Sequence, residues 1–420
     1  MTSAESGNPR PKAAILLVGT ELVTGQRSDT NGEEVARMLL TAGYAVVLRE
    51  VLPDDEGLVA ETLRAVTQQY ELVVVTGGLG PTHDDVTREA AARALDRVLI
   101  HRADLEEGLS EVAARQRHDD AAAQILRQAD VIEGARVLLP QAGTAPGQLL
   151  VTSRGHLLLL PGPPHELRPM LIETLSLLQL RETPPPRVLG CVGLPESDVQ
   201  VLVQHALAAH KGVGFTVLAK PAYVDVMLFA ETAVATQLDH AAEEIAGVLG
   251  DVCYAADGRS LAEVVVQLAV ERDMRLALAE SCTGGMIAAA LTSVPGASEV
   301  FVGGVVTYSN ALKTQLLGVG KPTLQKCGAV CAETAAEMAR GAKERLGAEI
   351  ALAVTGIAGP GGGEPHKPVG TVWFAVATER GVVSVHRLFS GDRHIIRERA
   401  TATALDLLRR ELLSHPVTHP

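Results

Sequence analysis

The chain has 420 residues, of which 47% are hydrophobic and 21% charged, so it is long enough for two or three domains with buried cores. Its net charge is −13 and its sequence contains no run of basic residues, which argues against binding of nucleic acid. Anionic small molecules are still possible ligands. No apolar stretch is long enough for a membrane helix and the first residues lack the apolar segment of a secretory signal, so we expect a cytoplasmic protein that does not bind a membrane.

The first part of the chain alternates short β-branched runs with amphipathic stretches. Strands buried on both faces read as continuous apolar runs, which predicts a parallel sheet with helices on both sides. The predicted elements are strand 13–18, helix 31–42, strand 45–51, helix 56–68, strand 72–76, helix 85–96, a strand at the sequence HLLLLPG and a helix near 165–180.

A glycine-rich segment follows the strand at 72–76 directly. Glycines at such a strand end let backbone amides approach a phosphate, so the segment that begins at Gly77 is a candidate phosphate cradle. Asp84 and Asp85 would repel a bare phosphate. A divalent metal ion between these carboxylates and a pyrophosphate would remove the conflict and activate water.

Glu21 and Asn31 follow the first predicted strand. Ligands of open α/β sheets bind at the carboxyl ends of the strands, so we expect both residues at the same crevice. An ordinary turn in which Asp84 or Asp85 caps the next helix is equally consistent with the sequence.

Three successive prolines in the segment 181–188 cannot continue a helix and predict a domain boundary. The middle segment, 187–254, is predicted as a small α+β domain. Its elements are a strand, a helix opened by Pro195, a strand, a strand at 223–230 and a helix near 234–249.

A capping box formed by Ser260 and Glu263 begins the third predicted domain, 258–415. A layered α/β domain is expected from strand 275–279, a helix from about 282, strand 300–307, helix 331–346, strands 350–355, 369–378 and 381–388, and helix 393–413. The five cysteines have no paired spacing, so we expect neither disulfides nor structural zinc, and we place Cys327 and Cys331 in the core.

Ser281 follows a strand of this third domain and precedes a helical run. Taken alone, such a serine is more often a helix cap than a nucleophile. Tyr308 and Lys313 come after the next strand, and a desolvated lysine beside a serine can accept its proton, which suits amide hydrolysis. Each of the two residues alone would more commonly be structural.

The segment from Thr355 to Gly363 supplies further backbone amides at a strand end, including those of Gly356 and Gly359. Lys367 follows closely, so this segment is a candidate for holding a ribose phosphate. A surface loop is the alternative.

These motifs resemble the CinA family over nearly the whole length. VGTELVTGQRSDTN, TGGLGPTHDDVT and PGPPHEL are similar to its molybdopterin-binding-like domain, and AESCTGG, TYSNALK, TGIAGPGGG and KPVGTVW are similar to nicotinamide mononucleotide deamidases. The resemblance implies three domains: a three-layer α/β molybdopterin-binding-like domain at 12–180, a KH-like α+β domain at 187–254 and an α/β deamidase domain at 258–415. The middle sequence HKGVGF lacks an evident GxxG loop, so RNA binding is not expected.

The resemblance also implies activities and roles. The C-terminal domain would hydrolyse nicotinamide mononucleotide to nicotinic acid mononucleotide and ammonia without a cofactor, a step of pyridine nucleotide salvage. The nucleophile would be Ser281 with Tyr308 and Lys313 as partners, and Thr283, Gly284 and Gly285 would contact phosphate or oxyanion. The N-terminal domain would be a metal-dependent ADP-ribose pyrophosphatase that acts through Glu21, Asn31, Gly78, Gly80, Thr82, Asp84 and Asp85. A homodimer is expected.

Two alternatives stay open. One is a non-catalytic nucleotide-binding adaptor in competence or in the DNA-damage response, although such an adaptor needs neither a nucleophile nor its base. A molybdopterin-handling protein would leave the C-terminal half unexplained.

Overall fold

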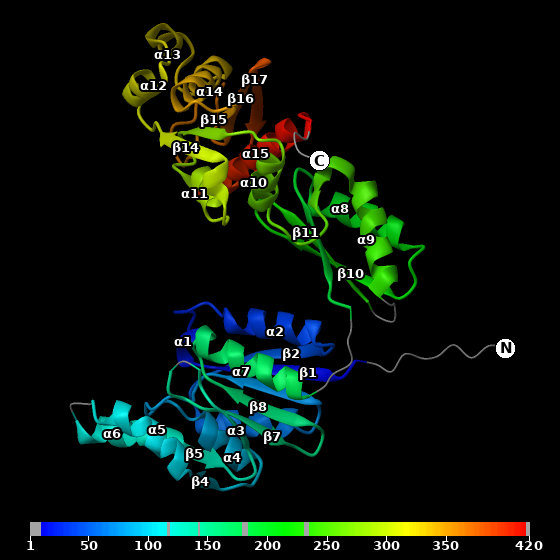
Figure 1. Cartoon of the computed structure of the whole chain (residues 1–420), viewed down its shortest axis with the longest axis vertical. Coiled ribbons are helices and arrows are strands. Elements are labelled where there is room, and N and C mark those ends of the chain that lie inside the picture. Colours follow the sequence, from blue (N-terminus) through cyan, green and yellow to red (C-terminus); the bar gives the residue numbers. More distant parts are fainter. Residues whose placement is uncertain (1–9, 116–117, 142, 179–183, 231–234, 417–420) are drawn as a thin grey trace, which may run out of the picture. The chain divides into compact units, whose positions relative to one another are not determined.

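The computed structural model describes residues 10–115, 118–141, 143–178, 184–230 and 235–416. The chain separates into two compact units, Met1–Pro185 and Pro186–Pro420, which are considered one at a time (Figure 1). Residues 181–183 of the predicted boundary lie outside the described residues. The division of the second unit into segments 187–254 and 258–415 stays a prediction.

The first unit is built on a six-stranded sheet with the order β2-β1-β3-β8-β7-β6. Four strands are parallel: β1 (Lys12–Val18), β2 (Ala45–Leu52), β3 (Leu72–Thr76) and β8 (His156–Leu160). These four are the strands that the sequence predicts, so the parallel sheet is confirmed for them. The sequence predicted no strand at β7 (Gly147–Val151) or β6 (Arg136–Leu138), which extend the sheet as antiparallel strands. The short segment 152–155 joins β7 to β8 without the crossover helix that parallel neighbours require.

Helices cover both faces of this sheet, which gives three layers (Figure 1). On one face pack α2 (Asn31–Thr41) and α7 (Pro164–Leu177), and on the other α3 (Glu56–Val66) and α4 (Thr87–Ala94). The sequence analysis assigned no element to an insertion after α4. It contains β4 (Leu99–His101), α5 (Ala103–Ala113), α6 (Asp119–Leu126) and β5 (Asp130–Ile132), and the short helix α1 (Thr20–Val23) was also missed.

The second unit begins with an antiparallel sheet of order β10-β11-β9-β12, on which two helices pack. Its elements are β9 (Arg187–Cys191), α8 (Glu196–Leu207), β10 (Val213–Ala219), β11 (Val224–Ala230), α9 (Ala235–Leu249) and β12 (Cys253–Ala255). This confirms the predicted α+β architecture. Strand β12 is too short for a sequence pattern to indicate it.

A five-stranded mixed sheet of order β14-β13-β15-β16-β17 follows. The strands are β13 (Leu276–Glu280), β14 (Phe301–Val306), β15 (Ile350–Gly356), β16 (Thr371–Thr378) and β17 (Gly381–Leu388). One face packs against α10 (Leu261–Glu271), α11 (Met286–Thr292) and α15 (Arg393–Leu413), and the other against α12 (Asn310–Leu317) and α14 (Ala332–Leu346). The predicted layered α/β class is confirmed.

The capping box forms as predicted at the start of α10. The Ser260 hydroxyl accepts from the Glu263 amide at 3.2 Å, and the Glu263 carboxylate accepts from the Ser260 amide at 2.6 Å.

Two expectations are wrong in this unit. Helix α11 begins at Met286 and not near 282, because Gly284 and Gly285 have φ of +62° and +95°, outside the helical range.

The second correction concerns the cysteines. Cys327 ends α13 (Lys321–Cys327) and Cys331 caps α14, and the structure joins them in a disulfide, contrary to the expectation of two separate thiols. The turn between the helices brings their Cα atoms to 6.0 Å, within the range that a disulfide spans.

Among the described residues, no helix has the length and apolar composition needed to cross a membrane.

Candidate functional site

A buried serine and a buried lysine meet at the carboxyl edge of the second unit's larger sheet. Ser281 follows β13 and Lys313 lies in the first turn of α12, 32 residues later. The Lys313 Nζ donates to the Ser281 Oγ at 3.0 Å and to the Thr307 carbonyl at 2.7 Å. The side chains predicted from the sequence to pair are thus within hydrogen-bond distance.

The surroundings of this pair favour a neutral amine. Lys313 is 1% exposed, and burial lowers the pKa of its amine because the charged form loses hydration. Among the described residues Lys313 forms no ion pair with a carboxylate. Burial raises the pKa of the adjacent Cys282 thiol to about 12, so this cysteine is not a thiolate nucleophile near neutral pH.

Glu280 fixes the turn that carries Ser281. Its carboxylate is 1% exposed and accepts from the amides of Gly285 at 2.9 Å, Ile287 at 3.3 Å and Ala288 at 2.8 Å. The carboxylate therefore satisfies the N-terminal amides of α11. The sequence analysis assigned no role to this residue, although it precedes the candidate nucleophile directly.

We expect Glu280→Gln to destabilise the protein by about 1–3 kcal/mol, because an amide offers one acceptor oxygen and presents a donor to a backbone N–H. The urea midpoint of unfolding measures the loss. Glu299→Gln, at an exposed position, is the matched control. An unchanged midpoint for Glu280→Gln would show that these hydrogen bonds contribute nothing.

The predicted contacts Thr283, Gly284 and Gly285 lie in this turn. The Gly285 amide is bonded to Glu280 and the Gly284 amide to the Ser281 carbonyl at 3.1 Å. In the described part of the chain, the amides of Cys282 and Thr283 have no backbone carbonyl or side-chain oxygen as acceptor, and both lie near the Cys282 sulfur. These two amides, and not those of the helix N-terminus, are therefore the candidate oxyanion donors.

Two threonine hydroxyls beside the serine–lysine pair, those of Thr283 and Thr307, are buried without a hydrogen-bond partner among the described residues. Both residues are fully buried. Unpaired buried hydroxyls are costly, and at a reactive centre they provide hydrogen-bonding capacity for a substrate or a water molecule. Thr307 is the first residue of the TYSNALK motif, but no role was predicted for it.

Tyr308 is not bonded to the serine–lysine pair. Its hydroxyl accepts from the Arg393 Nη2 at 2.9 Å, and the residue is 61% exposed. Arg393 also donates to the Gly359 carbonyl at 2.8 Å, so it connects Tyr308 to the segment after β15. On the same helix, α15, Arg397 donates to the Thr283 carbonyl at 2.7 Å. No local sequence pattern indicates these two contacts, because Arg393 lies 85 residues along the chain from Tyr308 and Arg397 lies 114 residues from Thr283.

The remaining candidates of this unit make structural contacts. The Thr355 hydroxyl donates to the Ala329 carbonyl at 2.8 Å, and the Lys367 Nζ donates to the Cys327 carbonyl at 2.6 Å. A Cβ added at Gly356 would lie 2.7 Å from Val372, and one added at Gly359 would lie 2.6 Å from Val369. Close packing therefore explains these two glycines as well as a ligand would.

The first unit has its own cavity, of about 770 Å³, at the carboxyl ends of β1, β3 and β8. All seven residues predicted for this half line it, namely Glu21, Asn31, Gly78, Gly80, Thr82, Asp84 and Asp85. The sequence analysis missed three further acidic lining residues, Asp29, Asp54 and Glu166. Burial raises the pKa of the Glu166 carboxyl.

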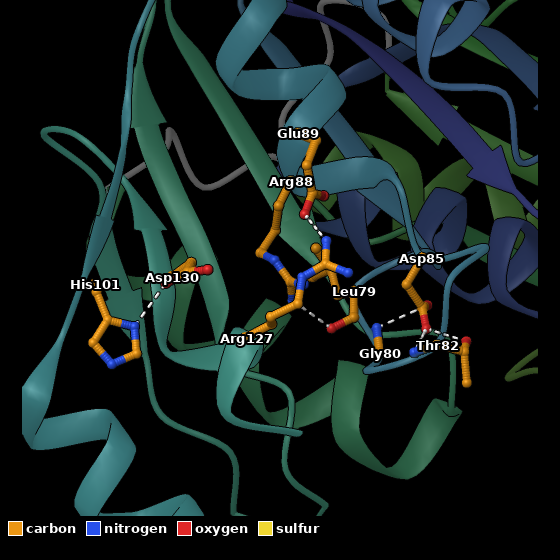
Figure 2. A network of polar contacts seen from close by, with 9 residues as sticks. All are labelled: Leu79, Gly80, Thr82, Asp85, Arg88, Glu89, His101, Arg127 and Asp130. Atoms are coloured by element: carbon orange, nitrogen blue, oxygen red, sulfur yellow. Dashed lines mark hydrogen bonds and ion pairs between the residues drawn. The ribbon is translucent and has the colours of Figure 1, made fainter. Parts of the chain in front are cut away.

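Asp85 shapes the glycine-rich loop. Its carboxylate accepts from the amides of Gly80 and Thr82, both at 2.8 Å, and from the Thr82 hydroxyl (Figure 2). Buried Arg88 reaches under the loop and donates to the Leu79 carbonyl at 2.9 Å (Figure 2). The loop is thus held by its own side chains. The cap alternative is wrong, because the N-cap of α4 is Val86 and no side chain caps this helix among the described residues.

Other predicted residues hold the walls of this cavity together. The Asn31 amide donates to the Gly162 carbonyl at 2.6 Å and to the Thr76 hydroxyl at 3.3 Å. Gly78 has a φ of +65°, and an added Cβ would lie 2.3 Å from the Thr87 hydroxyl, so no larger residue fits there. Glu21 borders the cavity without a hydrogen bond from its carboxylate to a described residue.

The donor set of the cavity fits a partly hydrated divalent cation that is shared with a phosphate ligand. The Asp84 side chain is 56% exposed, whereas both oxygens of Asp85 accept hydrogen bonds. Around this cavity, no three described His, Cys, Asp or Glu residues bring ligand atoms within 4.8 Å of one another. Magnesium-type sites commonly use one or two carboxylates together with substrate oxygens, and Asp84 would be the ligand here.

Similar proteins cover both units. The profile described as CinA C-terminal domain matches residues 258–412, and that described as probable molybdopterin binding domain matches 14–180. A CinA-like protein from Fervidobacterium nodosum is 38% identical over 403 residues, 96% of this chain and 98% of that protein. A CinA-like protein from Solibacter usitatus is 42% identical over 410 residues, 95% and 98% of the two chains. The crystal structure of a competence/damage inducible protein from Agrobacterium tumefaciens, 42% identical, covers 37% of this chain and 98% of that chain with a TM-score of 0.35.

Proposed function

Because the chain belongs to the CinA family, we propose that its second unit is an amidase that hydrolyses nicotinamide mononucleotide to nicotinic acid mononucleotide and ammonia. The observation that carries this proposal is the 3.0 Å hydrogen bond between the buried Lys313 amine and the Ser281 hydroxyl. A binding module does not require a buried amine that is hydrogen-bonded to a serine. Burial of this amine without a carboxylate partner lowers stability, which favours a catalytic role for it.

In the proposed reaction the neutral Lys313 amine takes the Ser281 proton while the oxygen attacks the carboxamide carbon. The amides of Cys282 and Thr283 are the proposed donors to the developing oxyanion. Collapse of the tetrahedral intermediate breaks the carbon–nitrogen bond, and the proton on Lys313 leaves with the nitrogen as ammonia. Water, deprotonated by Lys313, then hydrolyses the acyl-serine and releases the acid.

Tyr308 has a different place in this proposal from the one expected. Its exposed hydroxyl is held by Arg393 and not by Ser281 or Lys313. We therefore propose that Tyr308 and Arg393 contact the substrate, and that Lys313 alone activates the serine. Release of ammonia from nicotinamide mononucleotide by the purified protein, unchanged by a chelator, tests the reaction. No release at millimolar substrate would favour the adaptor alternative.

For the first unit we propose a metal-dependent pyrophosphatase that converts ADP-ribose to AMP and ribose 5-phosphate. The supporting observation is the acidic cavity in which Asp84 stays half-exposed while Asp85 holds the loop. A divalent cation bound there would neutralise the pyrophosphate and activate water. The glycine backbone of the loop would let the phosphates approach closely.

We expect Asp84→Asn to lower ADP-ribose hydrolysis by roughly 10²-fold or more, because a metal-binding carboxylate is lost. Chelation with EDTA should abolish the same activity and leave ammonia release intact. Chromatographic quantification of the AMP formed measures the effect, with Asp120→Asn, in α6 outside the cavity, as the control. Hydrolysis that survives both EDTA and Asp84→Asn would rule out the proposed metal site.

A further inference from the structure

A second cavity, of about 690 Å³, lies within the second unit and contains none of the residues assigned above to either reaction. It forms where the start of α8 and the β10–β11 turn meet β17 and α15. Its volume is in the range of small-molecule sites. The lining residues with the most informative chemistry are Lys220, Tyr223, Arg387, Phe389, Arg399 and Arg410.

Two arginines in this cavity are not neutralised. Within the described ranges, neither Arg387 nor Arg399 has a carboxylate oxygen within 4.0 Å, although the chain carries a net charge of −13. The other two cations are paired, because Lys220 bonds Asp225 at 2.5 Å and Arg410 bonds Asp406 at 2.7 Å. The positive excess of the cavity therefore comes from the two unpaired guanidinium groups.

Glu196, at the exposed start of α8, is the acidic lining residue that lacks an ion pair among the described residues. One carboxylate against the two guanidinium groups of Arg387 and Arg399 leaves the cavity positive. An anion would complete the charge balance, since uncompensated like charges facing one cavity repel each other.

Arg399 is held in position by the surrounding backbone. Its Nε donates to the Pro221 carbonyl at 2.9 Å, and its Nη1 donates to the Ser390 carbonyl at 2.8 Å and hydroxyl at 2.9 Å. The Nη2 group has no acceptor in the described part of the chain. A fixed guanidinium with a free donor is preorganised for an oxyanion, because little side-chain entropy remains to be lost on binding.

Two half-buried aromatic rings complete the site. Tyr223 packs edge-on against Tyr254 with ring centroids 6.1 Å apart, and Phe389 packs edge-on against Phe374 at 6.4 Å. These contacts hold both rings in the cavity wall, where they offer a rigid apolar surface to a planar base.

We propose that this cavity binds a nucleoside monophosphate, with its phosphate at Arg387 and Arg399 and its base against Tyr223 and Phe389. A phosphomonoester carries a charge of about −1.5 to −2 near neutral pH, which matches the two unpaired guanidinium groups. The site is separate from the proposed deamidase centre, so it stands whether or not that reaction is found.

Hydrogen–deuterium exchange of the full chain tests the site, because it reports each region separately from ligand bound in the first unit. We expect 5′-AMP to slow exchange in peptides that cover 192–199 and 219–224. Inorganic phosphate should protect them more weakly, and adenosine should not protect them. Protection by adenosine equal to that by AMP, or by AMP in the first unit alone, would overturn the proposal.

The variants Arg387→Met and Arg399→Met should each raise the AMP concentration for half-maximal protection by roughly tenfold or more. Arg399→Met also removes the bonds to Pro221 and Ser390, so Arg387→Met, which loses only a bond to the His386 carbonyl, is the cleaner variant. Arg340→Met, on exposed α14 surface outside the cavity, is the control. Unchanged protection in both cavity variants would contradict the assignment. Phosphate that protects as strongly as AMP would overturn the nucleotide in favour of phosphate alone.

Discussion

Replacing Ser281 with alanine is expected to lower the turnover of nicotinamide mononucleotide by on the order of 10⁴-fold, because no oxygen remains to form the acyl-enzyme. The Lys313 amine would lose one of its two hydrogen bonds and keep the one to the Thr307 carbonyl at 2.7 Å. Ammonia release under saturating substrate measures the change. Mass spectrometry of wild type quenched during turnover should detect a covalent adduct on the peptide that contains Ser281.

The control for this variant is the adjacent residue. Cys282 is buried, and the pKa of its thiol is raised to about 12, so Cys282→Ser should retain ammonia release within a few-fold. The urea midpoint of unfolding of Ser281→Ala should equal that of wild type, which would show that the second unit is folded. Normal ammonia release by Ser281→Ala would show that Ser281 is not the nucleophile. A loss of ammonia release in Cys282→Ser as large as the loss expected for Ser281→Ala would assign the nucleophile to the Cys282 thiol.

The serine–lysine pair could be predicted from the sequence because each residue follows a strand of the same sheet. Strands β13 and β14 are parallel neighbours, so the residues after them emerge at one edge. The position of Ser281 relative to α11 could not be read in the same way. An SCTGG sequence is typical of a helix start, and only the left-handed conformations of Gly284 and Gly285 delay the helix to Met286.

The contacts that position these residues were less accessible. Arg397 reaches the Thr283 carbonyl from a helix 114 residues away in the sequence, and Arg393 reaches Tyr308 across 85 residues. Neither arginine belongs to a local sequence pattern. Charged side chains on a helix are usually predicted to face solvent, and only the packed structure shows which groups they contact. Periodicity predicted the helix that carries them to its exact bounds and could not indicate what it contacts.

The first unit illustrates a second limit. The sequence placed seven residues at one crevice, and all seven line the cavity. It treated Asp84 and Asp85 as equivalent, although only Asp85 turns inward to the amides of Gly80 and Thr82. Adjacent residues with identical side chains differ here through backbone direction, which spacing alone does not reveal.

Replacing Lys313 with methionine is expected to lower ammonia release by roughly 10³-fold or more, because the serine proton then has no acceptor. Methionine has a similar length and fits the buried position, but it leaves the Thr307 carbonyl without the Lys313 donor, so we expect a small fall in the unfolding temperature. Lys313→Arg should also be inactive, since a guanidinium stays protonated at every accessible pH.

The pH dependence of wild type follows from the direction of the Lys313 shift. Burial lowers the pKa of its amine, so the neutral form that accepts the proton is populated at lower pH than for an exposed lysine. Turnover should rise with pH and level off once the amine is neutral, well below the usual lysine pKa of about 10.4. The kcat profile between pH 5 and 10, recorded with and without a chelator, measures this limb. A profile that rises only near the ordinary lysine pKa, or an active Lys313→Arg variant, would show that a different group accepts the proton.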